Sequence, residues 1–348
     1  MLAGKPYCPV LHARVAEIKG LRQLPEPSKD LLFPLIVGRP WPNAKLLEKT
    51  WDKLREAFGA RPFALDIDAF KRDSTSERPA AEAFRGLFDP TDGHRNYYAE
   101  IAKIGSAVPV LQLTNDDIPN LEAQLHRARE LDRGVVLRIQ HDISPNPHAL
   151  IARVLALQAD AVLLLDLGWA RDILNREVWA SGVLSQIDDP GREIVVASSS
   201  FPELFKSKAK DEIRVDERVV FESLVRRHNS LDLVYGDWGS TRPPRLPTPM
   251  GIIPPRVDLP MAREWLSFRK HGEEDYQKIA ERVIADSSWP RDLTIWGTYQ
   301  IQATAAGMEG SIRSQASAAA VRVNIHLHRQ AHFGAPGSFG DGDEPYID

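Results

Sequence analysis

Residues 134–166, GVVLRIQHDISPNPHALIARVLALQADAVLLLD, hold the pattern that decides the fold. The apolar runs at 134–139 and 161–166 have the length of strands and are too short for helices. Between them, residues 149–157 carry apolar side chains at helical spacing. A strand, a helix and a second strand in this order form a unit whose two strands lie parallel.

The same alternation of short apolar runs and helical segments extends from residue 8 to about residue 240. Most of the runs are apolar almost throughout, which is typical of strands buried on both faces of a parallel sheet. Further segments with helical periodicity lie at 46–58, 118–131 and 215–227. The eight apolar runs are residues 8–12, 33–37, 62–68, 108–113, 134–139, 161–166, 193–198 and 231–236.

Eight such units favour a closed barrel. An open doubly wound sheet is the alternative, but that fold usually has only about five or six strands. We therefore predict an α/β fold in which residues 7–240 form a (β/α)8 barrel of the TIM type.

The chain changes character after residue 240. Residues 241–260 are rich in proline and cannot form a helix, because each proline lacks an N–H donor and its ring clashes with the preceding turn. We predict that residues 241–333 form an extension packed on the barrel, with helices at 274–285 and 311–326 and a short strand or turn at 293–298. The Gly- and Asp-rich segment 334–348 is expected to be a flexible tail.

Composition narrows the choice of partners and of cellular location. The 348 residues include 44 Lys and Arg against 48 Asp and Glu, a formal net charge of -4, which gives no reason to expect duplex DNA or an anionic membrane as a partner. No apolar stretch approaches the roughly 18 residues of a membrane span, and the N-terminus lacks a secretory signal pattern. We expect a cytoplasmic protein in which the single cysteine, Cys8, is structural.

Charged and polar side chains stand at the ends of most of the predicted strands. In a barrel of this type, the functional site lies at the carboxyl ends of the strands. Asp66 and Asp68 follow the two-residue period of a strand, so their carboxylates share one face. We predict a site with catalytic residues Asp66, Arg138, Asp166 and Asp237, and with substrate-binding residues Arg39, Asp68, Gln140, Ser200 and Trp238.

A single strand-end Asp has a simpler interpretation, in which its carboxylate caps the next helix. For the whole set we favour a polar site at the barrel mouth, because buried carboxylates need partners. Arg39 and Arg138 can supply the compensating charge.

The order of several short motifs resembles one known family. The motifs are Tyr7-Cys-Pro-Val-Leu-His-Ala-Arg with Glu17, Pro34-Leu-Ile, Leu65-Asp-Ile-Asp68, Val136-Leu-Arg138, Leu165-Asp166, Ser199-Ser-Phe-Pro202 and Gly236-Asp237. Together they resemble the phage "beta protein" family, found in phages and bacterial genomes, over about residues 7–333. The resemblance implies the same architecture and a setting of conflict between phage and host.

Two functions follow from these observations, and both remain open at this stage. The first is an enzyme that acts on a phosphate-bearing substrate, such as a nucleotide or a nucleic-acid end. In this hypothesis arginines bind the phosphate, and aspartates act as bases or hold a divalent ion such as Mg²⁺. The second is a non-catalytic sensor or structural component that binds a protein partner in a defence or phage assembly.

Overall fold

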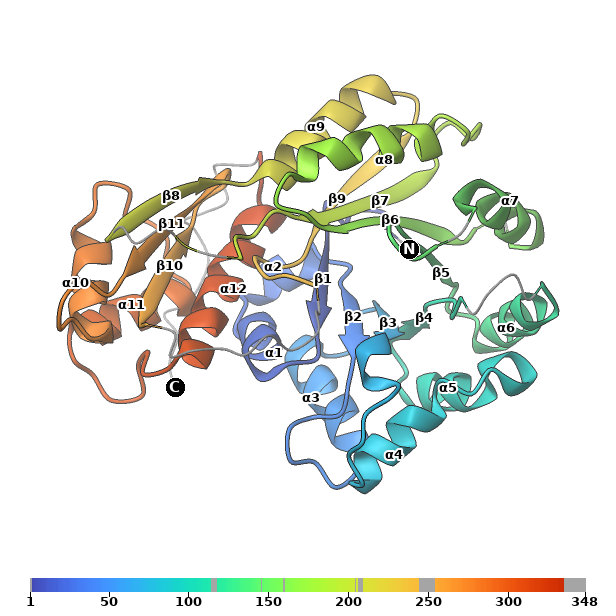
Figure 1. Ribbon diagram of the computed structural model, residues 1–348, viewed down its shortest axis with the longest axis horizontal. Coiled ribbons are helices and arrows are strands. Elements are labelled where there is room, and N and C mark those ends of the chain that lie inside the picture. The colour runs from blue at the N-terminus through green and yellow to red at the C-terminus, as the bar shows by residue number, and fades with distance from the viewer. Residues whose placement is uncertain are drawn as a thin grey trace.

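Eight parallel strands form an almost closed barrel in the computed structural model, which describes residues 2–113, 118–144, 146–158, 160–203, 205, 209–243 and 254–334 (Figure 1). Neighbouring strands follow the order β4-β3-β2-β1-β9-β7-β6-β5. A single parallel bridge between Val110 and Val136 joins the two ends of this order. The strands are β1 Tyr7–His12, β2 Leu35–Gly38, β3 Phe63–Ile67, β4 Ala107–Pro109, β5 Val136–Gln140, β6 Val162–Trp169, β7 Glu193–Ser199 and β9 Asp232–Asp237. The predicted barrel is therefore confirmed, and all eight predicted runs contribute a strand to it.

Alternation along each strand separates the barrel interior from the helix layer. Small and β-branched side chains such as Val10, Ala64 and Val195 pack together in the barrel interior. Larger side chains such as Leu65 and Leu137 lie on the outer face of the strands, where they pack with the helices. Residues two positions apart on a strand face the same side. A strand-end residue can therefore reach the barrel mouth only if it is in step with the inward-facing residues of its strand.

Helices cover the outside of the barrel (Figure 1). The four helices expected at 46–58, 118–131, 149–157 and 215–227 are confirmed, with starts that differ by up to two residues. The helices around the barrel are α1 Val15–Arg22, α2 Glu26–Asp30, α3 Glu48–Phe58, α4 Pro79–Gly86, α5 Thr91–Lys103, α6 Ile118–Leu131, α7 Pro147–Leu157, α8 Glu177–Leu184 and α9 Asp216–Arg227, with short 3-10 turns η1 Ala69–Lys71 and η2 Ile173–Arg176.

A second, antiparallel sheet lies at one side of the barrel, and the sequence did not predict it. Its strands are β8 Lys210–Arg214, β10 Arg256–Pro260 and β11 Glu264–Arg269, in the order β10-β11-β8. Strand β8 lies in the connection between β7 and α9, so this sheet combines residues from within the predicted barrel range with residues from the extension. Part of the predicted proline-rich segment, residues 244–253, lies outside the described residues, as does 335–348 of the predicted tail.

The helices of the extension correct two predictions. The expected strand or turn at 293–298 is wrong, because helix α11 begins at Trp296 and runs to Ala305. The last helix, α12, spans Gln315–Ala331 and so starts and ends later than expected. Its start is fixed by Ser314, whose side chain accepts a hydrogen bond from the Ser317 N–H. The remaining helix, α10, spans Tyr276–Ala285 and matches the prediction closely.

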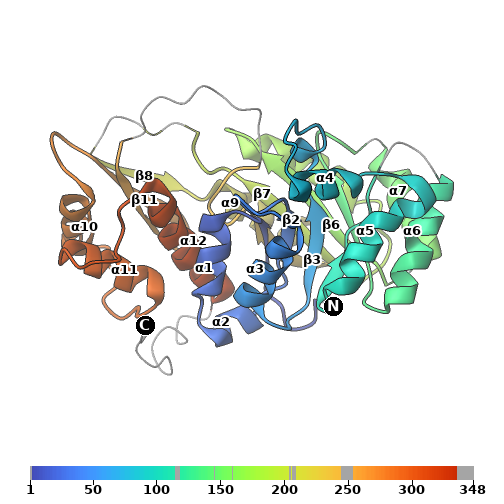
Figure 2. The same cartoon turned by 90° about the horizontal axis from the view of Figure 1, so that it is seen from below.

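Helix α12 joins the barrel to the extension. It lies beside α1, between the barrel and the second sheet (Figures 1 and 2). Gly20 permits this close approach, because a Cβ there would lie 2.8 Å from Val323 Cγ1. Val323 belongs to the apolar cluster of the barrel helices, whereas Val321 and Ile325 belong to that of the extension. Among the helices that the structure describes, none has the length and apolar character needed to cross a membrane.

Candidate functional site

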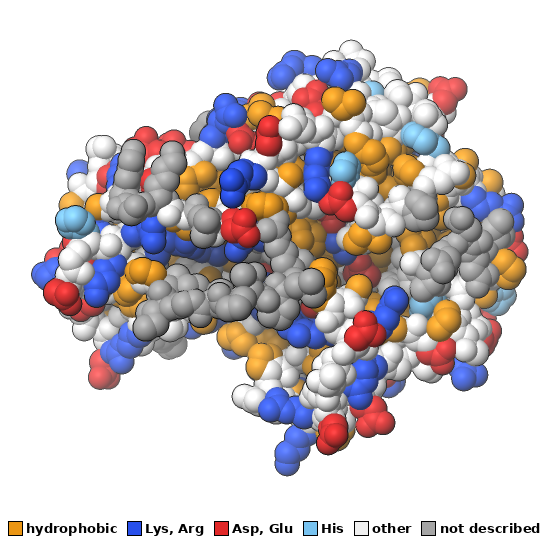
Figure 3. Space-filling model, viewed as in Figure 1, with side chains coloured by type: hydrophobic (Ala, Val, Ile, Leu, Met, Phe, Trp, Pro, Cys, Tyr) orange, Lys and Arg blue, Asp and Glu red, His pale blue; other side chains and the backbone are white. Residues whose placement is uncertain are grey.

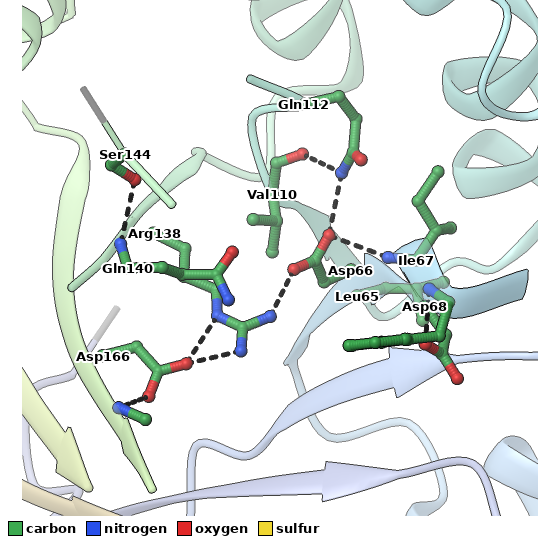
Figure 4. A network of polar contacts seen from close by, with 12 residues as sticks. Leu65, Asp66, Ile67, Asp68, Val110, Gln112, Arg138, Gln140, Ser144 and Asp166 are labelled. Carbon is green, nitrogen blue, oxygen red and sulfur yellow. Dashed lines mark hydrogen bonds and ion pairs between the residues drawn. The ribbon is translucent and has the colours of Figure 1, made fainter. Parts of the chain in front are cut away.

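Three of the predicted site residues meet inside the barrel mouth. The Arg138 guanidinium donates from Nη1 to Asp66 Oδ2 at 2.7 Å, and from Nε and Nη2 to Asp166 Oδ2 at 3.1 and 2.5 Å (Figure 4). Arg138 comes from β5, Asp66 from β3 and Asp166 from β6. We call these three residues the inner cluster. It joins three strands of the barrel through a single guanidinium.

The other oxygens of the inner cluster are also satisfied. Asp66 Oδ1 accepts hydrogen bonds from Gln112 Nε2 at 3.0 Å and from the Ile67 N–H at 2.8 Å. Asp166 Oδ1 accepts from Trp238 Nε1 at 3.1 Å and from the Gly168 N–H at 2.8 Å. Gly168 has a φ of 65°, which lets the chain turn so that its N–H points back to the carboxylate. Each aspartate thus binds a local backbone amide as well as a distant side chain.

Burial and charge complementarity hold this cluster together. Arg138 is buried, which by itself disfavours its charge, but the carboxylates of Asp166 and Asp66 raise its pKa above the usual value. The face of Trp238 lies over the guanidinium, with 5.3 Å between the guanidinium carbon and the ring centre. Two acidic side chains share one basic side chain, so the cluster contributes one more acidic group than basic groups to the mouth.

A cavity of about 1200 Å³ opens above the inner cluster. Figure 3 shows hydrophobic side chains gathered in the hollow over the barrel, with acidic and basic side chains among them. Polar and charged residues that line the cavity include Asp66, Asp68, Arg72, Gln112, Gln124, Arg138, Gln140, His141, Asp142, Asp166 and Arg176. A space of this size accommodates a nucleotide-sized ligand.

Asp68 and Arg39 form an ion pair at the edge of this cavity. Arg39 Nη1 lies 3.7 Å from Asp68 Oδ2, which is too long for a hydrogen bond. Asp68 Oδ1 accepts from the Phe70 N–H at 3.1 Å, but Oδ2 is buried and accepts no hydrogen bond from the residues that the structure describes. Burial raises the pKa of Asp68, although Arg39 and the Phe70 amide oppose the shift.

Asp237 does not join the inner cluster, contrary to the sequence prediction. Strand β9 directs Trp238 into the barrel, so its neighbour Asp237 points outward to the helix layer. There Asp237 Oδ1 accepts from Tyr7 Oη at 2.6 Å and from the Gly239 N–H at 2.7 Å, and Oδ2 lies 2.7 Å from His326 Nε2 on α12. Burial alone would raise the pKa of Asp237, but His326, Tyr7 and the Gly239 amide together lower it. We call Asp237, Tyr7 and His326 the outer cluster.

The remaining predicted residues lie in different places. Gln140 lines the cavity, and its backbone N–H donates to Ser144 Oγ at 3.0 Å. Trp238 lines the cavity but is almost fully buried, and its Nε1 donates to Asp166 Oδ1 of the inner cluster. Ser200 does not line the cavity: its hydroxyl donates to Glu217 and accepts from the Asp216 N–H at 3.1 Å, at the start of α9.

Sequence reasoning missed two residues at the mouth. The Gln112 side chain binds Asp66. The Gln124 side chain holds the backbone of Gln112 with two hydrogen bonds of 2.8 and 2.9 Å. His12, at the end of β1, is fully buried and its ring nitrogens have no hydrogen-bond partner among the described residues. Burial, with help from nearby arginines, lowers the pKa of His12, so it is neutral there. Gln112 lies two positions after Val110, and His12 lies two positions after Val10. Both valines face the barrel interior, so this two-residue period is the signal that could have identified Gln112 and His12.

The cavity offers only a partial site for the divalent ion considered above. Within the described ranges, no three His, Cys, Asp or Glu side chains lie close enough together to hold a metal ion. Asp66 and Asp166 already bind Arg138, so either would contribute at most one further oxygen. A Mg²⁺ ion needs few protein ligands when phosphate and water supply the rest, and Asp66 and Asp68 are the carboxylates that could provide them.

Comparison with known proteins identifies the family. The chain is 26% identical to Protein beta of Enterobacteria phage P4 over 353 aligned residues, which cover 97% of this chain and 96% of the phage protein. The match to the Beta protein family extends over residues 7–332, which include every residue of the inner and outer clusters. The chain therefore belongs to the Beta protein family.

Proposed function

We propose that the barrel mouth binds a phosphate-bearing ligand, a nucleotide or a nucleic-acid end, and that Asp68 acts on it as a general acid or base. Because a relative of this chain comes from a phage, we extend the proposal to a role in the conflict between phage and host. We place this activity in the cytoplasm, together with a protein partner from a phage or defence assembly.

The observation that carries this proposal is the state of Asp68. Its Oδ2 is buried and accepts no hydrogen bond among the described residues, and Asp68 is one of the residues that line a cavity of about 1200 Å³. A carboxylate with a raised pKa and a free oxygen is suited to exchanging a proton with a bound ligand. Asp66 and Asp166 are less suited to this role, because their oxygens are occupied by Arg138 and other donors.

The saturation of the inner cluster also favours a second candidate function. A rigid cluster whose hydrogen bonds are complete can position a ligand without reacting with it. In this alternative, the mouth is the binding site of a non-catalytic sensor, and Asp68 contributes only to affinity.

A panel experiment tests the proposal. The purified protein is mixed with nucleotides and with 5′-phosphorylated oligonucleotides, each with and without Mg²⁺, and the melting temperature and the formation of products are measured. We expect at least one ligand to raise the melting temperature and to be converted. Asp68→Asn should then lower the rate by roughly 100-fold or more, because proton transfer by a positioned group contributes about that much.

Glu77→Gln is the matched control, because Glu77 is an exposed acidic residue nearby that does not line the cavity. It should keep the wild-type rate. A ligand that binds without conversion would support the sensor, and conversion that Asp68→Asn leaves unchanged would exclude the proposed role of Asp68. Stabilisation by no member of the panel would contradict the ligand class itself.

A further inference from the structure

A second pocket, of about 410 Å³, lies beside the mouth and is strongly basic. Three segments line it, namely residues 13–15 after β1, residues 39–44 after β2, and residues from 71 to 81 around the start of α4. Its charged lining residues are Arg14, Arg39, Lys71 and Arg78. Among the described residues, no Asp or Glu lines this pocket. We call it the basic pocket.

These four cations are poorly compensated. In the part of the chain that the structure describes, the side chains of Arg14 and Lys71 form no ion pair within 4.0 Å. The Arg78 guanidinium donates to Asn43 Oδ1, a neutral acceptor, at 3.2 Å, and Arg39 has the 3.7 Å pair with Asp68. Elsewhere on the surface, an arginine such as Arg263 binds a carboxylate at 2.6 Å.

The cations also destabilise one another. Burial lowers the pKa of Lys71, and the neighbouring charges of Arg39 and Arg14 lower it further, while Asp68 opposes the shift. Arg39 shows the same effects, since burial and Arg14 lower its pKa while Asp68 opposes them. Glu17 also interacts electrostatically with Arg14 and Arg39. Burial raises the pKa of Glu17 to about 7, which weakens it as a counter-ion at neutral pH. An anion in the basic pocket would relieve this repulsion.

The backbone and the hydroxyl groups add to the preference for an anion. Helix α1 begins at Val15, which lines the pocket, so the positive end of the helix borders it. Ser74 and Ser76 also line the pocket and carry hydroxyl donors. Arginine forks, a lysine, hydroxyl groups and a helix N-terminus are the donors that proteins use to bind phosphate.

We propose that the basic pocket binds a phosphate or diphosphate group, held by Arg14, Arg39, Lys71 and Arg78. This inference adds a phosphate subsite to the proposed function, and it rests on that function for the rest of the ligand. The Arg39–Asp68 ion pair lies where the basic pocket meets the mouth, so one ligand can reach both. A phosphate in the pocket would place the attached part of the ligand beside Asp68. The sequence prediction gave this role to Arg39 and Arg138, but Arg138 is already bound by two aspartates.

The test uses inorganic pyrophosphate as the probe, measured by isothermal titration calorimetry with the full-length protein at constant ionic strength. We expect the wild-type protein to bind it. Arg14→Gln and Lys71→Gln should each weaken binding roughly tenfold, because each removes a charge-assisted interaction. Arg78→Gln, at an exposed position, repeats the test with the least risk to folding, and the melting temperature of each variant shows that it is folded.

Arg72→Gln is the matched control. Arg72 follows Lys71 in the sequence, but it lines the mouth cavity, and its guanidinium carbon lies 5.0 Å from the centre of the Phe88 ring. This variant should keep the wild-type affinity for pyrophosphate. The inference is overturned if the wild-type protein does not bind pyrophosphate, if the three basic-pocket variants bind as tightly as the wild type, or if Arg72→Gln weakens binding as much as they do.

Asp68→Asn separates this inference from the proposed function. Because the substitution removes the counter-ion of Arg39, pyrophosphate should bind at least as tightly as in the wild type, while conversion of the ligand is lost. If conversion persists in Asp68→Asn, the catalytic proposal fails and the basic pocket stands. If Asp68→Asn weakens pyrophosphate binding as strongly as Arg14→Gln, the anion does not occupy the basic pocket.

Discussion

The inner and outer clusters place strand-end aspartates on opposite sides of the barrel wall. In the inner cluster, the guanidinium of Arg138 is shared between Asp66 and Asp166. In the outer cluster, a single carboxylate, Asp237, is surrounded by donors from Tyr7, Gly239 and His326. Asp166 and Asp237 look equivalent in the sequence, but one borders a cavity and the other fixes a helix to the barrel. Burial of an aspartate therefore does not by itself mark a functional site, and the side of the wall that it faces must be known.

The largest expected effect is that of removing the shared cation. Arg138→Ala leaves two buried carboxylates without their counter-ion, so the free energy of unfolding should fall by about 3–5 kcal/mol. Urea unfolding measures this change. Arg153→Ala, which removes an exposed ion pair with Glu122, should cost less than about 1 kcal/mol. A similarly small loss for Arg138→Ala would show that the inner cluster is not held together by charge.

Removal of the outer carboxylate should have a smaller effect. Asp237→Ala leaves the Tyr7 hydroxyl, the Gly239 N–H and His326 Nε2 without their shared partner, so we expect a loss of about 3 kcal/mol in the same unfolding experiment. Because Asp237 faces α12, any ligand-induced rise in melting temperature should match that of the wild type. A variant that folds but no longer responds to the ligand would place Asp237 in the functional site after all.

Glu217, whose carboxyl group interacts with that of Asp237, should make the stability of the protein depend on pH. Burial, with the nearby charge of Asp237, raises the pKa of Glu217 to about 8. Since the folded state then holds this proton more tightly than the unfolded state, the stability of the wild type should fall as pH rises from about 4.5 to 8. Glu217→Gln lacks this titration, so the difference in unfolding free energy between variant and wild type should change by about 1–3 kcal/mol between pH 5 and pH 9. A constant difference across that range would contradict the raised pKa.

The smallest expected effect concerns Cys8, whose side chain belongs to the apolar cluster inside the barrel. Burial raises the pKa of the Cys8 thiol, so a thiol reagent should label the folded protein far more slowly than the unfolded protein. Cys8→Ala should cost only about 1 kcal/mol, because it removes one atom from a packed interior. Rapid labelling of the native protein would show that the barrel opens there. The labelling rate can also be compared between Arg138→Ala and Asp237→Ala, to find which cluster keeps the barrel closed.

Much of the barrel could be predicted from the sequence, whereas the second sheet could not. Each of the eight barrel strands is a short, mostly apolar run, so its own few residues are enough to predict it. Strand β8, Lys210–Arg214, reads KDEIR and is mostly polar, and it becomes a strand only because β11, more than 50 residues later, pairs with it. Helix α11 was missed because Trp296, Gly297 and Thr298 are poor helix formers, and contacts with α10 and α12 stabilise the helix instead.

For the candidate site, the sequence by itself determined that Asp66, Arg138 and Asp166 lie at the ends of parallel strands, because strand length and the two-residue period are local properties. It also determined that a buried arginine there must be compensated by carboxylates. Only the tertiary structure decided that Asp237 faces outward. Side chains along β9 alternate between inward and outward, and a shift of this alternation by one residue would exchange the places of Asp237 and Trp238. It likewise decided that Arg14, Arg39, Lys71 and Arg78 surround one pocket, because these residues come from loops after three different strands. The physical reason is that burial and pairing depend on which distant elements come into contact. The sequence shows only which side chains share a face of each helix or strand.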